Sequence, residues 1–494
     1  MLVTPSLSIK ESVQAVSKSR STGRFLSVEL ESVLVCFLLA FYNKQKMLKV
    51  QVISREMMKP STPTPPHLRS YKLTLIDRYC PASYVPFIFF YPNNEEEGPN
   101  TSSSAAEKIR KLKQSLSETL TLYYPLAGRM PDKETEGECN DEAEGVEVEE
   151  VECNDQGLEL CEARVEGRLS DLLRNPYMEV LDRLVPCNYL SPRSGVEGAM
   201  PVQLNVFDCG EIAVGVSAHH QVLDGVSLVQ FMNAWASASR GGCQVQAPLL
   251  HASELFPTQG FVPPFHARTK GNIVGRRFVF DAAKIEALRA GSDVTAAVRP
   301  TRVEAVSAII WKCMMQAHRD QLGGGRVSLA NQTVDLRRRM SPPAPPALFG
   351  NVISLGSSMA TEADWQQHDV QRCLEGKMRE AIKEVDDRHH ISVLQQPDGI
   401  ARLVEASLSK LVRYDESKVD LYPFSSWCGF PFYEVDFGWG KPAWVSACTM
   451  VSLNLVVLLN TRDGDGIEAW VSMEDVLMAR LVQDQELLRY ATSD

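Results

Sequence analysis

The sequence predicts an α/β protein of two domains with an active site where the domains meet. Its 494 residues suffice for two to four domains, and 44% apolar and 23% charged residues are ordinary for a globular protein. Predicted strands and helices alternate in both halves of the chain. Between the halves, residues 239–268 lack periodicity and are rich in Gly and Pro, as a linker is. We therefore expect domains at 47–238 and 269–494.

The first half begins with three clear elements. Residues 48–53 alternate in polarity and predict a strand, and the apolar run 84–91 predicts a buried one. Because Pro86 cannot donate a ladder hydrogen bond, we expect that strand to begin just after it. Ser104-Ala-Ala-Glu107 has the pattern of a capping box that opens a helix.

A hairpin and a helix follow in the middle of the chain. Residues 202–207 and 212–218 are β-rich runs joined by Asp208-Cys209-Gly210, a common hairpin turn. Apolar residues at helical spacing then predict a helix over 226–236. A loop from a strand to a helix lies between them.

The second half continues the alternation of strands and helices. Apolar helical spacing predicts a helix over 303–317 and a closing helix over 473–488, and no repeat of solenoid period appears. The strands that we expect here are 276–280, 327–334, 451–460 and 467–473.

His220 lies on the strand-to-helix loop and is the candidate general base. A neutral imidazole titrates near physiological pH, and rigid elements on both sides of the loop would hold it. Asp224, four residues later, can orient the loop, and Gly225 leaves room beside the base. His219 precedes it at the strand exit, so we expect its side chain to point elsewhere and pack. His-x-x-x-Asp alone also occurs by chance.

A second motif, Asp436-Phe-Gly-Trp-Gly440, lies near the end of the chain. With His220-Gln-Val-Leu-Asp-Gly225 it resembles the BAHD family of plant acyl-CoA-dependent acyltransferases. The resemblance runs from about Met47 to the C-terminus and is greatest to the branch containing vinorine synthase and salutaridinol acetyltransferase. Further segments that carry the family resemblance are Tyr124-Pro-Leu-Ala-Gly-Arg129, Thr301-Arg-Val-Glu-Ala-Val-Ser-Ala308, Phe349-Gly-Asn351 and Ser425-Ser-Trp427. The resemblance to the branch is carried by Val52-Ile-Ser-Arg-Glu56, Pro60-Ser-Thr-Pro-Thr-Pro-Pro66 and Asp463-Gly-Asp-Gly-Ile-Glu-Ala-Trp470.

The resemblance implies a fold and roles for residues. It implies two chloramphenicol-acetyltransferase-like sandwich domains, with the active site in a channel at their interface. His220 would be the base, and Asp224 would turn away and pair with an arginine, for which we choose Arg337. The arginines near Arg337 could instead bind coenzyme A. Ser425 would support the oxyanion, or else be a turn residue.

The resemblance also assigns supporting residues. It makes Asp436-Phe-Gly-Trp-Gly440 a structural motif, with Gly438, Trp439 and Gly440 in a tight loop. Contacts with acyl-CoA are implied for Ser307, Asn351 and Trp427. Acyl-CoA would be a co-substrate, and no permanently bound cofactor is expected.

Composition bounds the partners. The net charge of −11 comes from 132–155, which has twelve acidic residues against one lysine, so the rest is close to neutral. No basic patch favours nucleic acid. The acidic stretch resembles a solvated loop more than a calcium loop or an interaction segment. The twelve cysteines form no Cys-x-x-Cys pair, and we expect reduced thiols and no metal. His389-His390 is expected in a charged loop between helices.

The first 46 residues stand apart. Their apolar run, 33–40, is far shorter than the roughly 20 residues that a membrane span needs. A transit peptide is an alternative, but we expect an N-terminal extension that is disordered or artefactual, with Met47 as the functional start. A cytosolic monomer without membrane contact is expected.

Alternative functions have weaker support. Gly215-Val-Ser-Ala-His219 lacks the second glycine of a serine hydrolase elbow. A condensation domain shares the His-x-x-x-Asp-Gly pattern but not Asp436-Phe-Gly-Trp-Gly440. A non-catalytic protein that keeps the fold would need a disabled site, yet His220, Asp224 and Gly225 are intact. The resemblance to that branch of the family implies transfer of acetyl from acetyl-CoA to a hydroxyl of a bulky specialised metabolite such as an alkaloid or terpenoid. Hydroxycinnamoyl or other acyl donors and an amine acceptor remain open.

Overall fold

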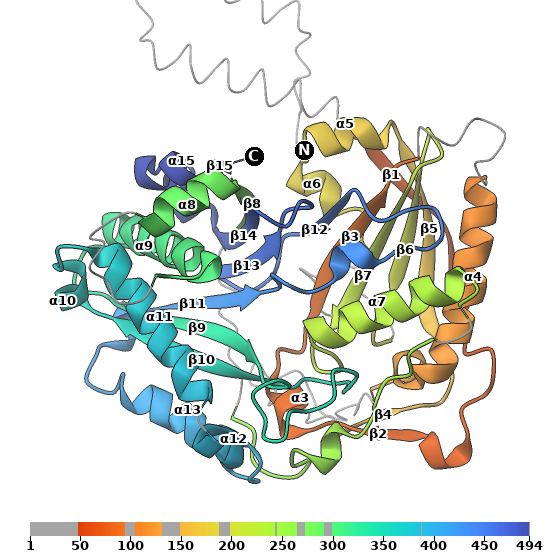
Figure 1. The fold of residues 1–494 in the computed structure, drawn as a ribbon, viewed down its shortest axis with the longest axis horizontal. Helices are drawn as coiled ribbons and strands as arrows, with labels where there is room; N and C mark the ends of the chain where they lie inside the picture. Colours follow the sequence, from red (N-terminus) through yellow and green to blue (C-terminus); the bar gives the residue numbers. More distant parts are fainter. Residues whose placement is uncertain are drawn as a thin grey trace, which may run out of the picture. The chain divides into compact units, whose positions relative to one another are not determined.

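Six strands form the first of two large β-sheets (Figure 1), in the order β1-β5-β6-β7-β3-β12. This computed structural model describes residues 48–93, 104–130, 149–186, 198–242, 245–263, 272–290, 299–386 and 388–493. Contacts group residues 50–494 into one compact unit. The strands of the first sheet are β1 (Lys49–Met58), β3 (Tyr84–Tyr91), β5 (Leu158–Glu166), β6 (Val202–Phe207), β7 (Ile212–His219) and β12 (Trp444–Ala447).

β7 is the central strand that carries the catalytic candidate. All eight of its residues are buried, because β6 and β3 pair with it on both edges and helices cover the sheet. Gly215 is required here, since a Cβ would lie 2.0 Å from the Leu184 carbonyl oxygen. The covering helices α4 (Ala105–Leu122) and α7 (Gly225–Ser239) meet where Trp235 Nε1 donates to the Leu112 carbonyl at 3.0 Å. Paired strands and packed helices therefore hold β7 in place up to the residue before His220.

β3 begins at Tyr84, so the prediction that it starts after Pro86 was wrong. β7 pairs with all eight residues of β3, whereas β12 pairs on the other edge only with Phe87–Phe90. Pro86 therefore lies past the end of the β12 ladder, where its missing N–H does not interrupt pairing with β12.

Seven strands form the second sheet, in the order β10-β9-β11-β13-β14-β8-β15. β11 is parallel to both of its neighbours, β9 and β13, and the other pairs are antiparallel. The strands are β8 (Ile273–Phe280), β9 (Val327–Asp335), β10 (Ile353–Ala360), β11 (Val419–Ser426), β13 (Leu455–Asn460), β14 (Ile467–Glu474) and β15 (Thr492–Ser493).

The second sheet has its own core. α9 (Arg302–Leu322) packs on it through buried residues along its length, and Trp311 Nε1 donates to Ser328 Oγ of β9 at 2.5 Å. The other helices on this side are α8 (Ala282–Ala290), α10 (Glu362–Trp365), α11 (Val370–Asp386), α12 (Arg388–Leu394), α13 (Gly399–Ser409), α14 (Asp475–Leu481) and α15 (Gln485–Tyr490).

Short elements complete the described chain. α3 (Leu75–Tyr79) begins at a capping box in which Thr74 and Asp77 bind each other's backbone N–H groups. β2 (Ser70–Lys72) and β4 (Glu150–Glu152) pair as a small separate sheet. The remaining elements are α5 (Leu169–Arg174), α6 (Met178–Leu181), η1 (Pro66–Leu68), η2 (Tyr124–Ala127), η3 (Ala252–Glu254), η4 (Glu416–Lys418) and η5 (Phe432–Glu434).

Three further predictions were wrong in detail. The closing helix 473–488 is two helices, because Asp484 accepts from the N–H groups of Glu486 and Leu487 and starts α15 anew. The strand predicted from residue 451 begins at Leu455, after Asn454 with φ 58°. His389 and His390 lie in α12 rather than in a loop.

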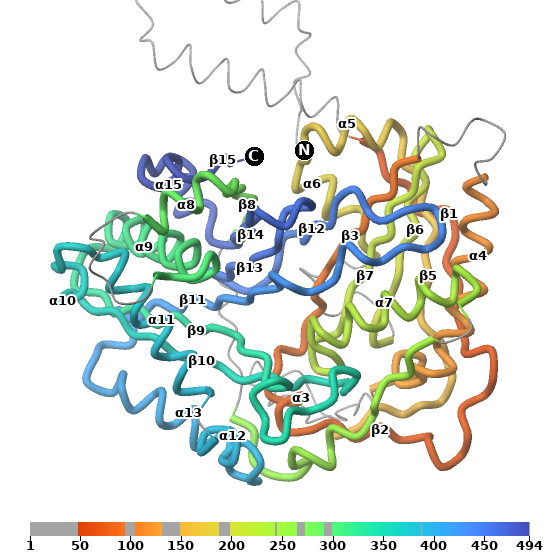
Figure 2. The backbone as a smooth tube through the Cα atoms, in the orientation of Figure 1, coloured from red at the N-terminus to blue at the C-terminus, as the bar shows by residue number. Residues whose placement is uncertain are grey.

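The sheets do not follow the predicted division of the chain. β12, from the C-terminal half, pairs with β3 and completes the first sheet, as the tube in Figure 2 shows. Because residues 50–494 are not divided further into compact units, the domain bounds 47–238 and 269–494 and the linker 239–268 stay a prediction. Residues 1–46 and most of the acidic stretch lie outside the described residues. No described helix has the length and apolar character needed to cross a membrane.

Candidate active site

His220 follows the last residue of β7 and begins the loop to α7. Its backbone N–H donates to the Ser83 carbonyl at 2.9 Å, and the Val222 N–H donates to the His219 carbonyl at 3.0 Å. Asp224 is the N-cap of α7, with a carboxylate that accepts from the Ser227 N–H at 2.8 Å. The loop between them is thus fixed at both ends.

Asp224 and Arg337 form a buried ion pair. Arg337 Nη1 and Nη2 donate to the two carboxylate oxygens at 2.8 and 3.1 Å. With the Ser227 N–H, the Val352 N–H at 3.1 Å brings the hydrogen bonds to this carboxylate to four. Burial raises the pKa of Asp224, but Arg337 and the backbone donors more than offset this and lower it. Asp224 is therefore a charged structural group.

Arg337 is also bound to the segment before β10. Its guanidinium donates to the Leu348 and Gly350 carbonyls, at 2.9 and 3.2 Å from Nη2, and to Asp335 at 2.8 Å. These contacts connect the start of α7 to the end of β9 and to residues 348–350. The ion pair therefore links the two sheets beside His220.

Asn351 holds the backbone of His220. Its Nδ2 donates to the His220 carbonyl at 2.7 Å and to Asp77 Oδ1 at 2.8 Å, and its N–H also donates to that Asp77 oxygen at 2.8 Å. Asp77 Oδ2 accepts from the N–H and the hydroxyl of Thr74, both at 2.8 Å. Asp77 and Asn351 are both fully buried.

The imidazoles are held neutral. Burial lowers the pKa of His220 below 6.5, and its own carbonyl, Asp224 and the Asn351 side chain offset only part of that effect. Burial, with His220 beside it, lowers the pKa of His219 to about 4. Burial raises the pKa of Asp77 to about 6, against hydrogen bonds from Asn351 and Thr74 that lower it. A neutral imidazole is the form that accepts a proton.

A cavity of about 2860 Å³ opens beside His220. Both sheets and the segments after their strands line it. His219 of β7, His220 and Gly225 lie on one side, and Ser425 of β11 and Trp427 lie on the other. Sites for single small molecules are typically about 300–1,000 Å³. The cavity therefore has room for two substrates at once.

Ser425 and Trp427 face this cavity from β11 and the turn after it. Trp427 Nε1 donates to Ser425 Oγ at 2.9 Å, which leaves the hydroxyl hydrogen free for another acceptor. The Trp427 ring lies 4.2 Å from that of Phe87 of β3. A Cβ on Gly225 would lie 3.0 Å from the Phe430 ring, so the glycine permits this close approach.

The second motif is a closed loop. Asp436 Oδ1 accepts from the N–H groups of Gly438 and Gly440 at 2.8 and 3.0 Å, and both glycines have positive φ, 106° and 103°. Trp439 packs on Phe437 at 5.8 Å. The carboxylate is occupied by its own loop, and Asp436 is not among the residues lining the cavity.

Two residues for which the resemblance implied contact with acyl-CoA lie off the cavity wall. Ser307 is buried in α9, and Asn351 is buried behind His220; neither is among the described lining residues, whereas Trp427 is. Contacts between these residues and acyl-CoA stay predictions. Asp77 was missed, although Thr74-Leu-Ile-Asp77 has the spacing of a capping box.

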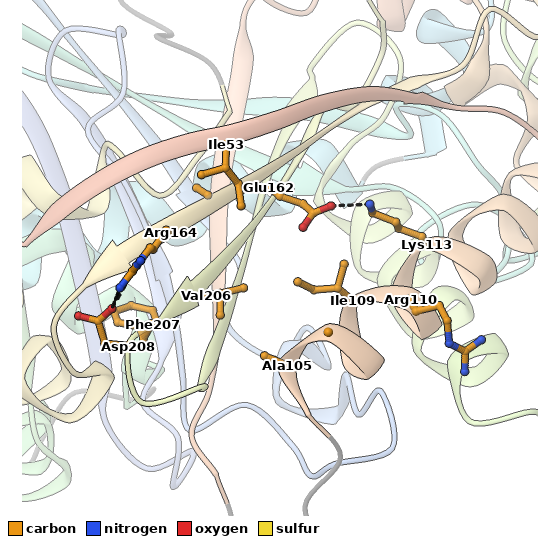
Figure 3. Close-up of a pocket in the computed structure, with 12 residues that line it drawn as sticks. Ile53, Ala105, Ile109, Arg110, Lys113, Glu162, Arg164, Val206, Phe207 and Asp208 are labelled. Atoms are coloured by element: carbon orange, nitrogen blue, oxygen red, sulfur yellow. Dashed lines mark hydrogen bonds and ion pairs between the residues drawn. The ribbon is translucent and has the colours of Figure 1, made fainter.

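A second, smaller hollow lies between α4 and the first sheet (Figure 3). It is lined by residues such as Ile53, Ile109 and Val206, with a volume of about 640 Å³. Lys113 at its rim already pairs with Glu162 at 2.5 Å and Arg164 with Asp208 at 3.0 Å. None of the predicted site residues lines it. In the described part of the chain, no group of three or more His, Cys, Asp or Glu could hold a metal ion.

Comparisons with known proteins agree with this geometry. The model of the Transferase family matches residues 48–488. Vinorine synthase of Rauvolfia serpentina is 35% identical over 90% of this chain and 99% of its own length. Stemmadenine O-acetyltransferase of Catharanthus roseus is 34% identical over 88% of this chain and 97% of its own length. Limonoid 7-O-acetyltransferase of Citrus sinensis is 32% identical over 90% of this chain and 99% of its own length.

Solved structures agree on the fold. The crystal structure of vinorine synthase superposes with a TM-score of 0.76 at 33% identity, covering 90% of this chain and 99% of that one. F. graminearum TRI101, complexed with coenzyme A and deoxynivalenol, shares the fold at 16% identity. Its TM-score is 0.62, and the match covers 86% of this chain and 99% of that one. The resemblance seen in the sequence is confirmed, as is the two-sheet α/β fold. The chain belongs to the BAHD transferase family and is an acyltransferase.

Proposed function

We propose that this acyltransferase moves an acetyl group from acetyl-CoA to a hydroxyl of a bulky specialised metabolite, with His220 as general base. The observation that carries the proposal is a neutral imidazole on the wall of a cavity lined by both sheets and large enough for two substrates. Such a cavity allows direct transfer in a ternary complex, because donor and acceptor can lie side by side.

The reaction needs one proton to move twice. His220 takes the proton of the acceptor hydroxyl while the oxygen attacks the thioester carbon, and an oxyanion forms on the former carbonyl. When the oxyanion collapses, the carbon–sulfur bond breaks and the imidazolium returns the proton to the thiolate. The products are the ester and free coenzyme A thiol, so proton and electrons balance.

Ser425 is proposed as the oxyanion donor. Because Trp427 Nε1 donates to Ser425 Oγ, the hydroxyl hydrogen is the free end of this pair, on the cavity wall. One such donor is typically worth about 10²–10³ in kcat. Asp224 and Arg337 are proposed to hold the loop rather than touch substrate, since their polar atoms are bound to each other and to backbone groups.

The acetyl donor and the acceptor class rest on the relatives. Their names include an O-acetyltransferase of stemmadenine and one of a limonoid, so an alkaloid or terpenoid hydroxyl is the proposed acceptor. One methylene changes binding in an apolar pocket by only about 1–3 kcal/mol, so the same fold suits longer donors such as hydroxycinnamoyl-CoA. An amine acceptor would need the same base.

Acyl-CoA is proposed as a co-substrate, with no resident cofactor. A cytosolic monomer is also part of the proposal. Two observations support it: the described cysteines are free thiols, and the residues of a single chain, from both sheets, line the cavity.

A donor panel read by thiol release tests the proposal. Acyl-CoAs would be incubated with purified enzyme and plant metabolite extract, and products would be identified by mass spectrometry. We expect acetyl-CoA to be consumed with a mass gain of one acetyl group, and His220→Ala to lower turnover about 10²–10⁴-fold. His251→Ala, which lies off the cavity, is the control. No thiol release with any donor, or full activity of folded His220→Ala, would contradict it.

A further inference from the structure

Three strands of the second sheet, β10, β9 and β11, lie side by side and line the cavity with one face (Figure 1). Helices cover the other face of these strands. Gln332 Nε2 of β9 donates there to the Met378 carbonyl of α11 at 3.0 Å, and the Ser358 hydroxyl of β10 donates to the same helix at 3.1 Å. Successive side chains of a strand point to opposite faces, so the residues next to Gln332 and Ser358 point toward the cavity.

Polar side chains form a continuous row on the cavity face. Ser425 of β11 and Thr333 of β9 are level on adjacent strands, because the two strands are paired in parallel up to the preceding residues. Asn331 lies two residues before Thr333, and its partner on β10 is Ser357, whose hydroxyl donates to Asn331 Oδ1 at 2.9 Å. All four residues line the cavity. This polar track consists of Ser425, Thr333, Asn331 and Ser357.

Two side chains of the polar track have donors to spare. Ser357 occupies Asn331 Oδ1, and the Asn331 Nδ2 hydrogens find no acceptor within the described part of the chain. The Thr333 hydroxyl likewise makes no hydrogen bond to any residue that the structure describes. Asp335, the next residue on this face, already pairs with Arg337 at 2.8 Å. Asn331 and Thr333 are only partly exposed, so a ligand that fills the cavity either binds these donors or leaves them unsatisfied at a cost.

Apolar side chains flank the polar track. Leu329 precedes Asn331 on the same face of β9, and Leu421 is its partner on β11. Leu355 of β10 is the partner of Thr333. This face therefore suits a mainly apolar skeleton that carries a few separated oxygens. Coenzyme A beyond its thioester is a chain of amides and phosphates, which suits such a face poorly.

The polar track sets a spacing between two oxygens of a ligand. Adjacent strands are about 4.8 Å apart and residues two apart on a strand about 6.7 Å, so Asn331 lies about 8 Å from Ser425. Ser357, one strand further, lies about 12 Å from Ser425. In the proposed function the reacting hydroxyl lies beside Ser425, because that hydroxyl attacks the carbon on which the oxyanion forms.

Resting on the proposed function, we infer that Asn331 determines acceptor specificity by binding a second oxygen of the acceptor, roughly 8–12 Å from the hydroxyl that is acylated. Asn331 Nδ2 donates to that oxygen, and Ser357 holds the amide through Oδ1. The acceptor class is therefore a polycyclic metabolite with oxygen functions at both ends of its skeleton. A mono-ol with the same skeleton leaves the Asn331 donor unsatisfied.

Equilibrium dialysis with a defined panel tests the inference without turnover. The panel consists of steroids with the same four fused rings: a mono-ol, a diol with adjacent hydroxyls and a diol with hydroxyls at opposite ends of the ring system. Free and bound steroid are measured by mass spectrometry. We expect wild type to bind the end-to-end diol about 10-fold more tightly than the mono-ol or the adjacent diol, because only that diol reaches both ends of the polar track.

Paired variants separate recognition from folding. Asn331→Leu keeps the volume of the side chain and removes the donor, so the end-to-end diol should bind about as weakly as the mono-ol. Ser357→Ala should weaken binding of that diol about threefold, because the amide loses its support. Gln332→Leu and Ser358→Ala are the matched controls, since both side chains lie on the helix-covered face. The controls should lose stability while the ratio of diol to mono-ol affinity stays unchanged.

Kinetics add a second readout. In the thiol-release assay, Asn331→Leu should raise KM for a doubly oxygenated acceptor about 10-fold and leave KM for acetyl-CoA unchanged within about twofold. Four results would overturn the inference: equal binding of mono-ol and end-to-end diol by wild type, binding of neither, a diol preference that persists in Asn331→Leu, or a raised KM for acetyl-CoA. The dialysis on wild type needs no variant and no acyl donor, so it stands even if the thiol-release assay rejects the proposed reaction.

Discussion

Replacing Arg337 with methionine should destabilise the enzyme more than any surface charge change. Asp224 would remain buried, 4% exposed, with the N–H groups of Ser227 and Val352 as its remaining described donors and no cation. Removing one partner of a buried ion pair typically costs about 3–5 kcal/mol. The Leu348 and Gly350 carbonyls would also lose their guanidinium donors.

Urea denaturation followed by circular dichroism measures this cost. With an m-value of about 3 kcal/mol/M, the expected loss lowers the midpoint by about 1 M or more. Asp224→Asn should cost less, about 1–3 kcal/mol, because Arg337 keeps Asp335 at 2.8 Å. The double variant should cost less than the sum of the two by about 1–3 kcal/mol, since the two groups contact each other.

The exposed pair Arg164–Asp208 supplies the control. Its side chains are 66% and 43% exposed, so Arg164→Met should cost less than about 1 kcal/mol. Since Arg337 holds the pKa of Asp224 low, the pair's contribution is present above the unfolded carboxyl pKa of about 3.9 and is lost as pH falls below it. Two results would refute the structural role of the Asp224–Arg337 pair. One is a urea midpoint for Arg337→Met as high as that for Arg164→Met at pH 7, and the other is a double variant that costs the full sum of Arg337→Met and Asp224→Asn.

Four further outcomes are expected. Since burial lowers the pKa of His220, the acidic limb of kcat/KM should have its midpoint below pH 6.5, and a midpoint above 7 would count against this base. Because the pKa of Asp77 is raised to about 6, raising the pH from 4 to 6.5 should lower the free energy of unfolding of the wild type by up to about 3 kcal/mol relative to Asp77→Asn. Urea midpoints of the two proteins that change equally with pH would contradict this. Gly225→Ala should cost about 1–3 kcal/mol because its Cβ would meet Phe430 at 3.0 Å; an unchanged urea midpoint would show that the ring yields freely. A chain beginning at Met47 should match the full chain in thiol release, and a fall would assign a function to the residues before it.

Local patterns made some of the fold predictable. The hairpin of β6 and β7 and the helix α7 depend on neighbours within about 30 residues, and their apolar spacing predicts them nearly residue by residue. His220 could be placed on its loop for the same reason. The final helix was mispredicted because one capping side chain, Asp484, outweighed continuous apolar spacing.

Long-range contacts were not predictable from pattern. Arg337 lies 113 positions from Asp224, and only the family resemblance suggested that they pair. β12 has four residues, too few for periodicity to show that it belongs beside β3. Asp77 lies 274 positions from Asn351, and its capping-box spacing predicts a helix start but gives no sign of a contact with the site.

The two buried carboxylates at the site, Asp224 and Asp77, differ in how their ionisation affects the free energy of folding. Asp224 has a cation, and its pKa is lowered, so its charge stabilises the fold at neutral pH. Asp77 has only neutral donors, no described salt bridge reaches it, and its raised pKa means that ionisation destabilises the folded state. As the N3 residue of a capping box alone, a neutral Gln would accept from the Thr74 N–H without that penalty. Only an ionised carboxylate offers an oxygen that accepts two N–H groups of Asn351 while the other accepts both donors of Thr74. The cost of this charge is therefore best explained by the fixed amide beside His220.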